Sequence, residues 1–246
     1  MSRVLLVVPC YNEAHRLNVD AFRRFRLDGH QIEFCFVNDG SGDSTLSVLE
    51  SMRAEDPARF SVLNLERNQG KAEAVRRGIA ASFDRADYIG FWDADLATPL
   101  TELPSFIDIL NRRKETQMVF GARVRLLGRE ISRQPARHYV GRVGATLISS
   151  SLGLAIYDTQ CGAKLFRPSE TIRDIFASPF LSRWLFDVEI IARFVERCGR
   201  DVAAGAIYEM PINVWHDVKG SKVKPLDFLR ALRDLRKIRR RYNSHR

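Results

Sequence analysis

The sequence has few cysteines and no long hydrophobic run, and both absences narrow the class of protein. Its four cysteines, at positions 10, 35, 161 and 198, lie far apart, without a Cys-x-x-Cys pair for zinc or redox chemistry. Cys10 and Cys35 fall in apolar runs and are interpreted as core residues, so we expect a reducing compartment. The longest uncharged run, residues 143–157, is too short for a transmembrane helix and is diluted by Ser, Thr and Gly.

We expect no secretory leader, because residues 3–9 already form a strand-like run and no cleavage site accompanies them. We therefore expect a cytoplasmic protein that can touch a membrane without spanning it. Hydrophobic residues make up 45% of the 246 positions and charged residues 28%, as in folded soluble proteins. The length suits one large α/β domain.

Acidic residues are outnumbered: 30 Asp and Glu face 39 Lys and Arg, for a net charge of +9. Such a charge favours nucleic acid, an anionic membrane or a phosphorylated substrate as partner. The basic residues cluster at 123–142 and 219–246, without a zinc-finger, RNP or basic-zipper pattern. We do not expect a nucleic-acid partner, although a non-catalytic binding protein whose charge is its purpose remains the alternative from another class.

The first half of the chain alternates strands with helices, which predicts a mostly parallel sheet with helices on both faces. The predicted strands are residues 4–8, 32–37, 60–65 and 88–92, and the helices 14–27, 45–54 and 72–82. In the second half we predict helices at 102–111, 168–176 and 184–197, strands at 118–120, 162–166 and 210–215, and a basic, partly helical segment at 123–151. We interpret residues 1–246 as one domain: a nucleotide half (1–100), an acceptor half (101–224) and a basic amphipathic C-terminal helix (225–246).

The polar turns that follow the first four strands share one edge of the predicted sheet, where ligands collect. Asp93 and Asp95 follow the apolar strand 88–92, and residues i and i+2 share a face, so both carboxylates can approach one cation. Mg²⁺ and Mn²⁺ bind through one or two carboxylates together with substrate phosphates. The side chains expected to converge at this edge are Tyr11, Glu13, Asp39, Ser41, Asn68, Lys71, Asp93 and Asp95.

Read in order, these turns resemble glycosyltransferase family 2, whose members are inverting nucleotide-sugar enzymes of the Rossmann-like GT-A fold. The matching segments are VPCYNE at 8–13, VNDGS at 37–41, NQGKA at 68–72 and DAD at 93–95. Three later segments resemble the dolichyl-phosphate β-glucosyltransferase branch of polyprenyl-phosphate glycosyltransferases: DTQCGAKLF at 158–166, RWLFDVE at 183–189 and GSK at 220–222.

The resemblance implies a donor site, a metal site and an acceptor site. Donor-binding residues would be Pro9, Tyr11, Asn12, Glu13, Asp39, Gly40, Ser41, Lys71, Asp93, Ala94 and Asp95. Asp95, with Asp93 beside it, would hold Mg²⁺ or Mn²⁺, which stabilises the departing diphosphate as a Lewis acid. A polyprenyl phosphate acceptor is already an oxyanion, so it needs positive charge rather than a base. The residues suited to it are Arg123, Arg137, Arg142 and Lys222.

Two alternatives stay open within this reading. If the acceptor is a saccharide hydroxyl, a general base is required, and Asp187 would serve as that catalytic residue. The second alternative is GDP-mannose as the donor. The related mannose synthases carry Gln at the position of Ala97, and this difference favours a UDP-hexose, UDP-glucose, as the donor. The eukaryotic glucosyl enzymes that the sequence resembles have an N-terminal membrane anchor, which we do not expect here. We therefore expect peripheral attachment at the inner face of the membrane, directly or through a membrane-protein partner.

Overall fold

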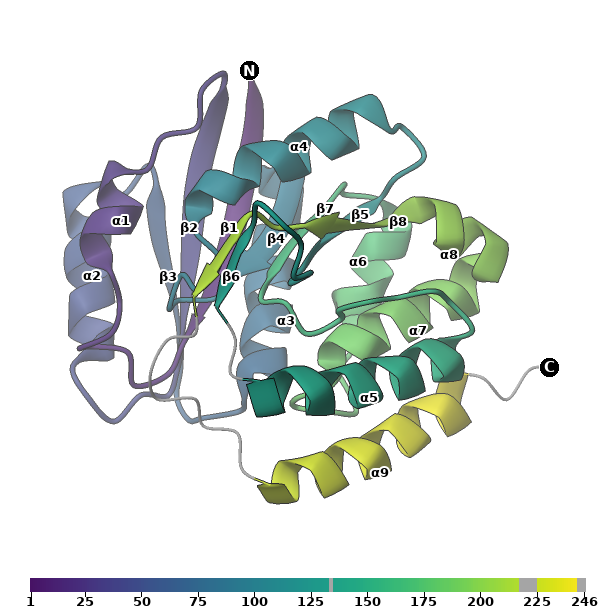
Figure 1. Cartoon of the computed structure of the whole chain (residues 1–246). Helices are drawn as coiled ribbons and strands as arrows, with labels where there is room; N and C mark the ends of the chain where they lie inside the picture. Colours follow the sequence, from purple (N-terminus) through teal and green to yellow (C-terminus); the bar gives the residue numbers. More distant parts are fainter. Residues whose placement is uncertain (133–134, 217–224, 243–246) are drawn as a thin grey trace.

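The computed structural model describes residues 1–132, 135–216 and 225–242 (Figure 1). The strands are numbered in sequence order, and most of their residues are buried. They are β1 (Ser2–Cys10), β2 (His30–Asp39), β3 (Phe60–Leu65), β4 (Tyr88–Trp92), β5 (Met118–Ala122), β6 (Glu130–Ser132), β7 (Ala163–Phe166), β8 (Ile207–Pro211) and β9 (Val214–His216).

The helices fill the connections between these strands. They are α1 (Val19–Arg24), α2 (Thr45–Glu55), α3 (Lys71–Ser82), α4 (Leu103–Arg112), α5 (Pro135–Leu152), α6 (Glu170–Ala177), α7 (Phe186–Cys198), α8 (Arg200–Ala206) and α9 (Pro225–Tyr242), with short 3₁₀ turns η1 (Phe83–Arg85) and η2 (Leu100–Glu102).

Within the described residues, the main sheet has the strand order β3-β2-β1-β4-β7-β5-β8, and β6 pairs separately with β9. β1 is parallel to β2 and β4, and β2 is parallel to β3. β7 is antiparallel to both of its neighbours, β4 and β5, whereas β5 and β8 are parallel. The prediction of a mostly parallel sheet is confirmed. The reversed strand β7 brings its first residue, rather than its last, to the edge where β4 ends.

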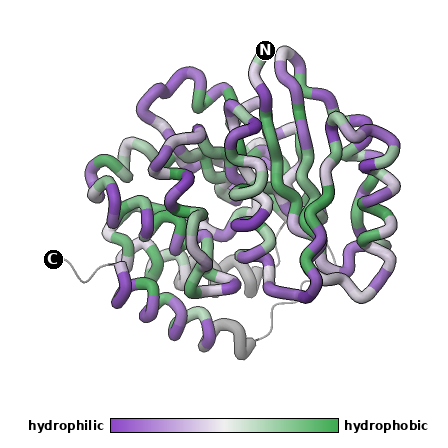
Figure 2. Tube along the Cα trace, turned by 180° about the vertical axis from the view of Figure 1, so that it is seen from behind, coloured by the Kyte–Doolittle hydropathy of each residue, from purple (hydrophilic) through white to green (hydrophobic). Residues whose placement is uncertain are grey.

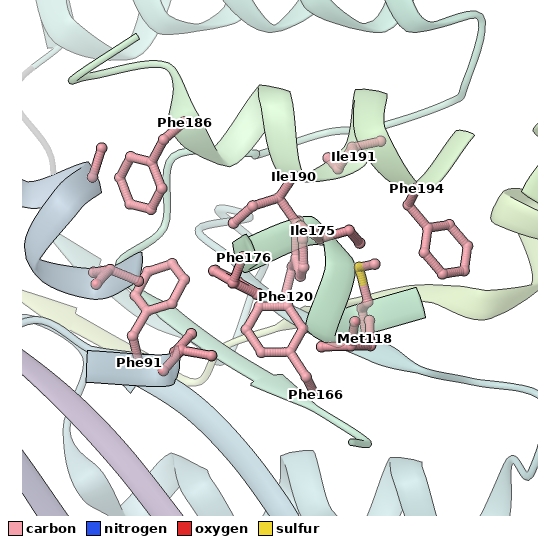
Figure 3. Packing of buried hydrophobic residues seen from close by; sticks show 14 of the residues in the cluster. Phe91, Met118, Phe120, Phe166, Ile175, Phe176, Phe186, Ile190, Ile191 and Phe194 are labelled. Atoms are coloured by element: carbon pink, nitrogen blue, oxygen red, sulfur yellow. The ribbon is translucent and has the colours of Figure 1, made fainter. Parts of the chain in front are cut away.

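Helices cover both faces of the sheet, as predicted, and each face has its own hydrophobic cluster. On one face, Phe91, Phe120 and Phe166 from neighbouring strands pack under α6 and α7, against Phe176 and Phe186 (Figure 3). Burying each such side chain stabilises the fold by roughly 1.5–3 kcal/mol. The apolar runs of the strands, buried on both sides, fix the sheet and therefore the position of its polar edge.

Several predicted boundaries are wrong, for local reasons. The helix predicted over 14–27 forms only as α1, because Asn18 caps it by accepting a hydrogen bond from the amide of Ala21 at 3.0 Å. The helix predicted from 168 begins as α6 at Glu170, after its N-cap Ser169. The strand predicted over 210–215 divides into β8, which pairs with β5, and β9, which pairs with β6. Helix α8, seven residues long, was not predicted.

Helices α5 and α9 lie side by side at the bottom of Figure 1, next to α7. The end of α9 is fixed by Tyr242, whose hydroxyl donates a hydrogen bond to buried Glu189 at 2.9 Å. In Figure 2, hydrophobic colour is continuous along the central strands and alternates with hydrophilic colour along the outer helices. Within the described residues, no helix combines the length and apolar character needed to cross a membrane.

Candidate active site

Asp93 and Asp95 lie immediately after β4, in the turn that leaves the sheet. The amide of Asp93 donates a hydrogen bond to the carbonyl of Gly162 at 2.9 Å, which joins this turn to the start of β7. Leu96 has a φ of +50°, and its amide closes the turn on the carbonyl of Asp93 at 3.1 Å. The carboxylate of Asp95 accepts a hydrogen bond from the amide of Ala97 at 3.1 Å. The structure thus places both acids at the sheet edge where the sequence predicted them.

Two cationic side chains approach these carboxylates from neighbouring turns. Lys71 Nζ, at the start of α3, lies 2.5 Å from Asp93 Oδ1. Arg16 Nη2 lies 3.9 Å from Asp95 Oδ2. Burial, and then the charge of Asp93, raise the pKa of Asp95 above its ordinary value. A carboxylate whose charge is disfavoured in this way gains most from a further cation beside it.

Gly162 leaves no room between β7 and the Asp93 side chain. A Cβ atom built on Gly162 would lie 1.9 Å from Asp93 Oδ2 and 2.1 Å from its Cγ. Any larger residue must therefore displace the carboxylate. Sequence reasoning quoted Gly162 within a family segment but gave it no role, because its contact with Asp93 crosses about seventy positions of the chain.

The residues at this edge fit a divalent cation that shares its coordination with a diphosphate. Within the described parts of the chain, no three His, Cys, Asp or Glu side chains gather as a complete metal cage. Asp93 and Asp95 would supply the one or two carboxylates that Mg²⁺ and Mn²⁺ take alongside phosphate oxygens and water.

The predicted donor residues of the first two turns hold each other in place. The amide of Asn12, which has a φ of +53°, donates to Ser41 Oγ at 3.0 Å. Its side-chain oxygen accepts a hydrogen bond from the amide of Gly42 at 2.9 Å. The amide of Glu13 donates to Thr45 Oγ1 at 2.8 Å. These bonds join the turn after β1 to the turn after β2. Pro9 lies near the end of β1, exposed Tyr11 follows that strand, and Gly40 follows β2, whereas buried Ala94 lies between Asp93 and Asp95 after β4.

Asp39, at the end of β2, is buried, and its carboxylate is hydrogen-bonded to the turn that follows β3. Its carboxylate accepts hydrogen bonds from the amides of Gln69 and Gly70 at 2.7 and 2.8 Å, and from the Asn68 side chain at 3.0 Å. Residues 67–70, which we call the donor loop, are therefore fastened to β2 at this carboxylate. Gly70 has a φ of +96°, a conformation that other residues rarely adopt. Asp39 therefore fixes the position of the donor loop relative to the sheet.

Asp187 lies in the first turn of α7 and forms a buried ion pair. Lys164 Nζ, with a fully buried side chain, is 2.6 Å from Asp187 Oδ1 and donates a hydrogen bond to the Cys161 carbonyl at 2.6 Å. Burial raises the pKa of Asp187, and the charges of Lys164 and Lys71 oppose that rise. This influence of Lys71 puts Asp187 within electrostatic range of the Asp93–Lys71 pair. Sequence reasoning did not single out Lys164, a fully buried lysine on a strand.

Arg123 is the one predicted acceptor residue whose side chain the structure describes. Its guanidinium forms two hydrogen bonds with Asp158, from Nε at 2.6 Å and from Nη2 at 2.8 Å. Burial opposes the charge of Arg123, but Asp158 outweighs it and raises its pKa, so the side chain is a fixed cation. The side chains of Arg137 and Arg142, on α5, and the whole of Lys222 lie outside the described residues.

Comparison with known proteins accounts for this arrangement. A family model described as "Glycosyl transferase family 2" matches residues 5–171, which contain Asp39, Lys71, Asp93 and Asp95. The chain belongs to this family and is a glycosyltransferase.

Curated relatives narrow the similarity. A dolichyl-phosphate beta-glucosyltransferase of Dictyostelium discoideum is 31% identical over 96% of this chain and 74% of its own length. The enzyme of the same name from Homo sapiens is 32% identical over 98% of this chain and 76% of its own length.

Solved structures match the fold. Glucosyl-3-phosphoglycerate synthase from Mycobacterium tuberculosis in complex with UDP superposes with a TM-score of 0.67 at 20% identity, over 97% of this chain and 80% of its own. Another crystal structure of that protein, with Mn²⁺, UDP-glucose and phosphoglyceric acid, gives a TM-score of 0.66 over the same shares. At this identity the likeness supports the GT-A fold alone.

Proposed function

We propose that this glycosyltransferase moves a hexose from a nucleotide donor, UDP-glucose, onto a polyprenyl phosphate at a membrane surface. The observation that carries the proposal is that Asp93, Asp95 and Lys71 lie together at the end of β4. A fixed arginine, Arg123, lies in the segment between β5 and β6. The similarity to dolichyl-phosphate beta-glucosyltransferases supports the choice of sugar and acceptor.

At the donor edge, Asp95 and Asp93 would hold Mg²⁺ or Mn²⁺, which supplies a Lewis acid for the diphosphate leaving group. Lys71 adds a positive charge beside Asp93, and the donor loop, held by Asp39, would flank the nucleoside. The backbone of Ala97, rather than its side chain, contacts Asp95, so this position adds no ligand of its own. That agrees better with a UDP-hexose than with GDP-mannose as donor.

A phosphate acceptor suits the surroundings of Asp187 better than a hydroxyl does. A general base must reach the proton that it removes. Asp187 is buried and its carboxylate lies 2.6 Å from the ammonium of Lys164. We propose that Asp187 orders the base of the pocket, while attack comes from an acceptor oxygen that is already negative and needs no base. Reaction of that oxygen from the side opposite the leaving group would invert the sugar configuration.

The outer face of α9 supports attachment at an anionic membrane surface, which we propose to be the inner, cytoplasmic face. The side chains of α9 that are described as exposed are all basic: Arg230, Arg233, Arg236, Lys237, Arg239, Arg240 and Arg241. Lys and Arg near a bilayer each contribute about 1 kcal/mol of attraction to acidic lipid.

The proposal is tested by transfer of labelled sugar to polyprenyl phosphate with Mg²⁺ or Mn²⁺, across a panel of UDP- and GDP-sugars. A chloroform-soluble product from UDP-glucose, absent for Asp95→Ala and present for Asp108→Ala on exposed α4, supports it. Transfer only from GDP-mannose contradicts the donor. Metal-dependent hydrolysis of the donor without any lipid product contradicts the acceptor and restores a saccharide hydroxyl, with Asp187 as base.

A further inference from the structure

A polar groove of about 660 Å³ lies behind the donor loop, between α3 and residues 179–183. Four arginines line it, Arg67, Arg76, Arg77 and Arg183, with Glu73 as the one acidic side chain among the lining residues. The groove shares Asn68 and Gln69 of the donor loop with the donor edge, but its lining residues take no part in the described contacts of Asp93, Asp95 and Asp187. Four guanidinium groups around one hollow call for an anion with several oxygen atoms.

Among the described residues that line the groove, the one carboxylate, that of Glu73, is paired with two of the arginines. Glu73 accepts hydrogen bonds from Arg76 Nε and Nη2, both at 2.7 Å, and from Arg77 Nε at 2.9 Å. These bonds, led by those from Arg76, lower the pKa of Glu73. Its single negative charge therefore stays in place and leaves the groove with an excess of positive charge.

The other two arginines have no carboxylate partner within the described residues. Arg183 donates through Nε to the carbonyl of Gln69 at 2.8 Å and through Nη2 to that of Asn68 at 3.3 Å. These neutral acceptors orient the guanidinium without cancelling its charge. Arg67 is exposed and forms no ion pair with any described residue. Arg67 and Arg183 thus present charge that no described carboxylate compensates. Arg67 comes from the donor loop, and Arg183 comes from the 179–183 segment, which its hydrogen bonds join to that loop.

We propose that this groove binds a phosphate-bearing ligand, separately from the nucleotide edge of the sheet. Arg76 and Arg77, held by Glu73, form one wall, and Arg67 and Arg183 are the groups that grip the phosphate. The ligand is either a soluble phosphate compound or the phosphate of an anionic lipid headgroup, since both present the same oxygen atoms. The groove touches the donor loop on the side away from Asp39, so both sites can be filled together.

The test compares the full chain with Arg67→Gln, and with Arg112→Gln as a control of equal charge on an exposed position of α4. One arm titrates inorganic phosphate by calorimetry, with and without UDP. The other measures sedimentation with phosphatidylglycerol vesicles, against phosphatidylcholine vesicles. Loss of a charge-assisted hydrogen bond predicts about a tenfold weaker binding for Arg67→Gln and no change for Arg112→Gln.

Each outcome decides the matter. A tenfold loss in the phosphate arm supports a soluble ligand, and a loss confined to the phosphatidylglycerol arm supports a lipid headgroup. Equal binding by all three proteins, or an equal loss in both variants, overturns the proposal. Competition between UDP and phosphate also overturns it, since the groove would then belong to the donor site. Neither arm measures sugar transfer, so a failed transfer assay and a failed groove remain distinguishable.

Discussion

Gly162, the residue before β7, lies so close to the Asp93 side chain that a methyl group added at position 162 should displace the carboxylate and slow sugar transfer. Alanine at position 162 would place its Cβ 1.9 Å from Asp93 Oδ2, whereas ordinary contact begins at 3.4 Å. The carboxylate must therefore move by about 1.5 Å, and a misplacement near 1 Å costs roughly a hundredfold in rate. We expect Gly162→Ala to lower kcat for sugar transfer by about a hundredfold or more. The backbone bond from Asp93 to residue 162 remains available.

The assay is the initial rate of labelled-sugar transfer, with circular dichroism and a thermal melt to confirm folding. Gly205→Ala is the matched control, because a Cβ on that α8 residue meets no atom within 4 Å. It should keep wild-type activity. A folded Gly162→Ala protein with a rate within twofold of wild type would refute the reasoning, since the Asp93 position would then be unimportant for transfer.

Three further predictions follow from contacts elsewhere. Lys71→Met removes the cation 2.5 Å from Asp93, so kcat/KM for the donor should fall by about a hundredfold; unchanged kinetics would contradict an electrostatic role. Glu73 has a folded pKa below its ordinary 4.5 because it accepts hydrogen bonds from Arg76, so its stabilising effect is full above that value and lost as pH falls through the lower folded pKa. Urea denaturation should show Glu73→Gln less stable than wild type at pH 7 and equal to it in strong acid, and a difference independent of pH would be inconsistent with this. Tyr242→Phe deletes a hydrogen bond to a buried carboxylate and should lower the free energy of unfolding by about 1–2 kcal/mol in the same assay, whereas no change would mean that the end of α9 is not docked.

The sequence predicts the fold well where a local pattern determines it. Strands β3 and β4 match their predicted ranges, because apolar runs bounded by polar turns leave little choice. The direction of β7 could not be predicted, since pairing between strands about seventy residues apart leaves no local signal. The division of residues 210–215 between two sheets was missed for the same reason.

The same distinction applies to the site. Asp93, Asp95 and Lys71 could be predicted as site residues, because they are polar residues directly after an apolar strand or at the start of a helix. The structure brings them together. The residues that hold them in place could not be predicted in this way. Gly162 is important because it has no side chain that would collide with Asp93. Lys164 is a charged residue on an otherwise apolar strand, and its role can be recognised only from its ion pair with Asp187.

The antiparallel strand β7, which lies between β4 and β5, has a consequence for folding during synthesis. In the folded protein β4 pairs with β1 on one side and with β7 on the other, and β7 is synthesised about seventy residues after β4. At roughly 5–20 residues per second, that wait lasts about 4–14 s. During it, a fully apolar strand presents an open edge, the kind of surface that recruits strands from other chains. Nascent chains halted before residue 163 should therefore depend most on chaperones. The turn after β4, which carries Asp93 and Asp95, gains its final shape only when that edge is closed, because the amide of Asp93 bonds to the carbonyl of Gly162.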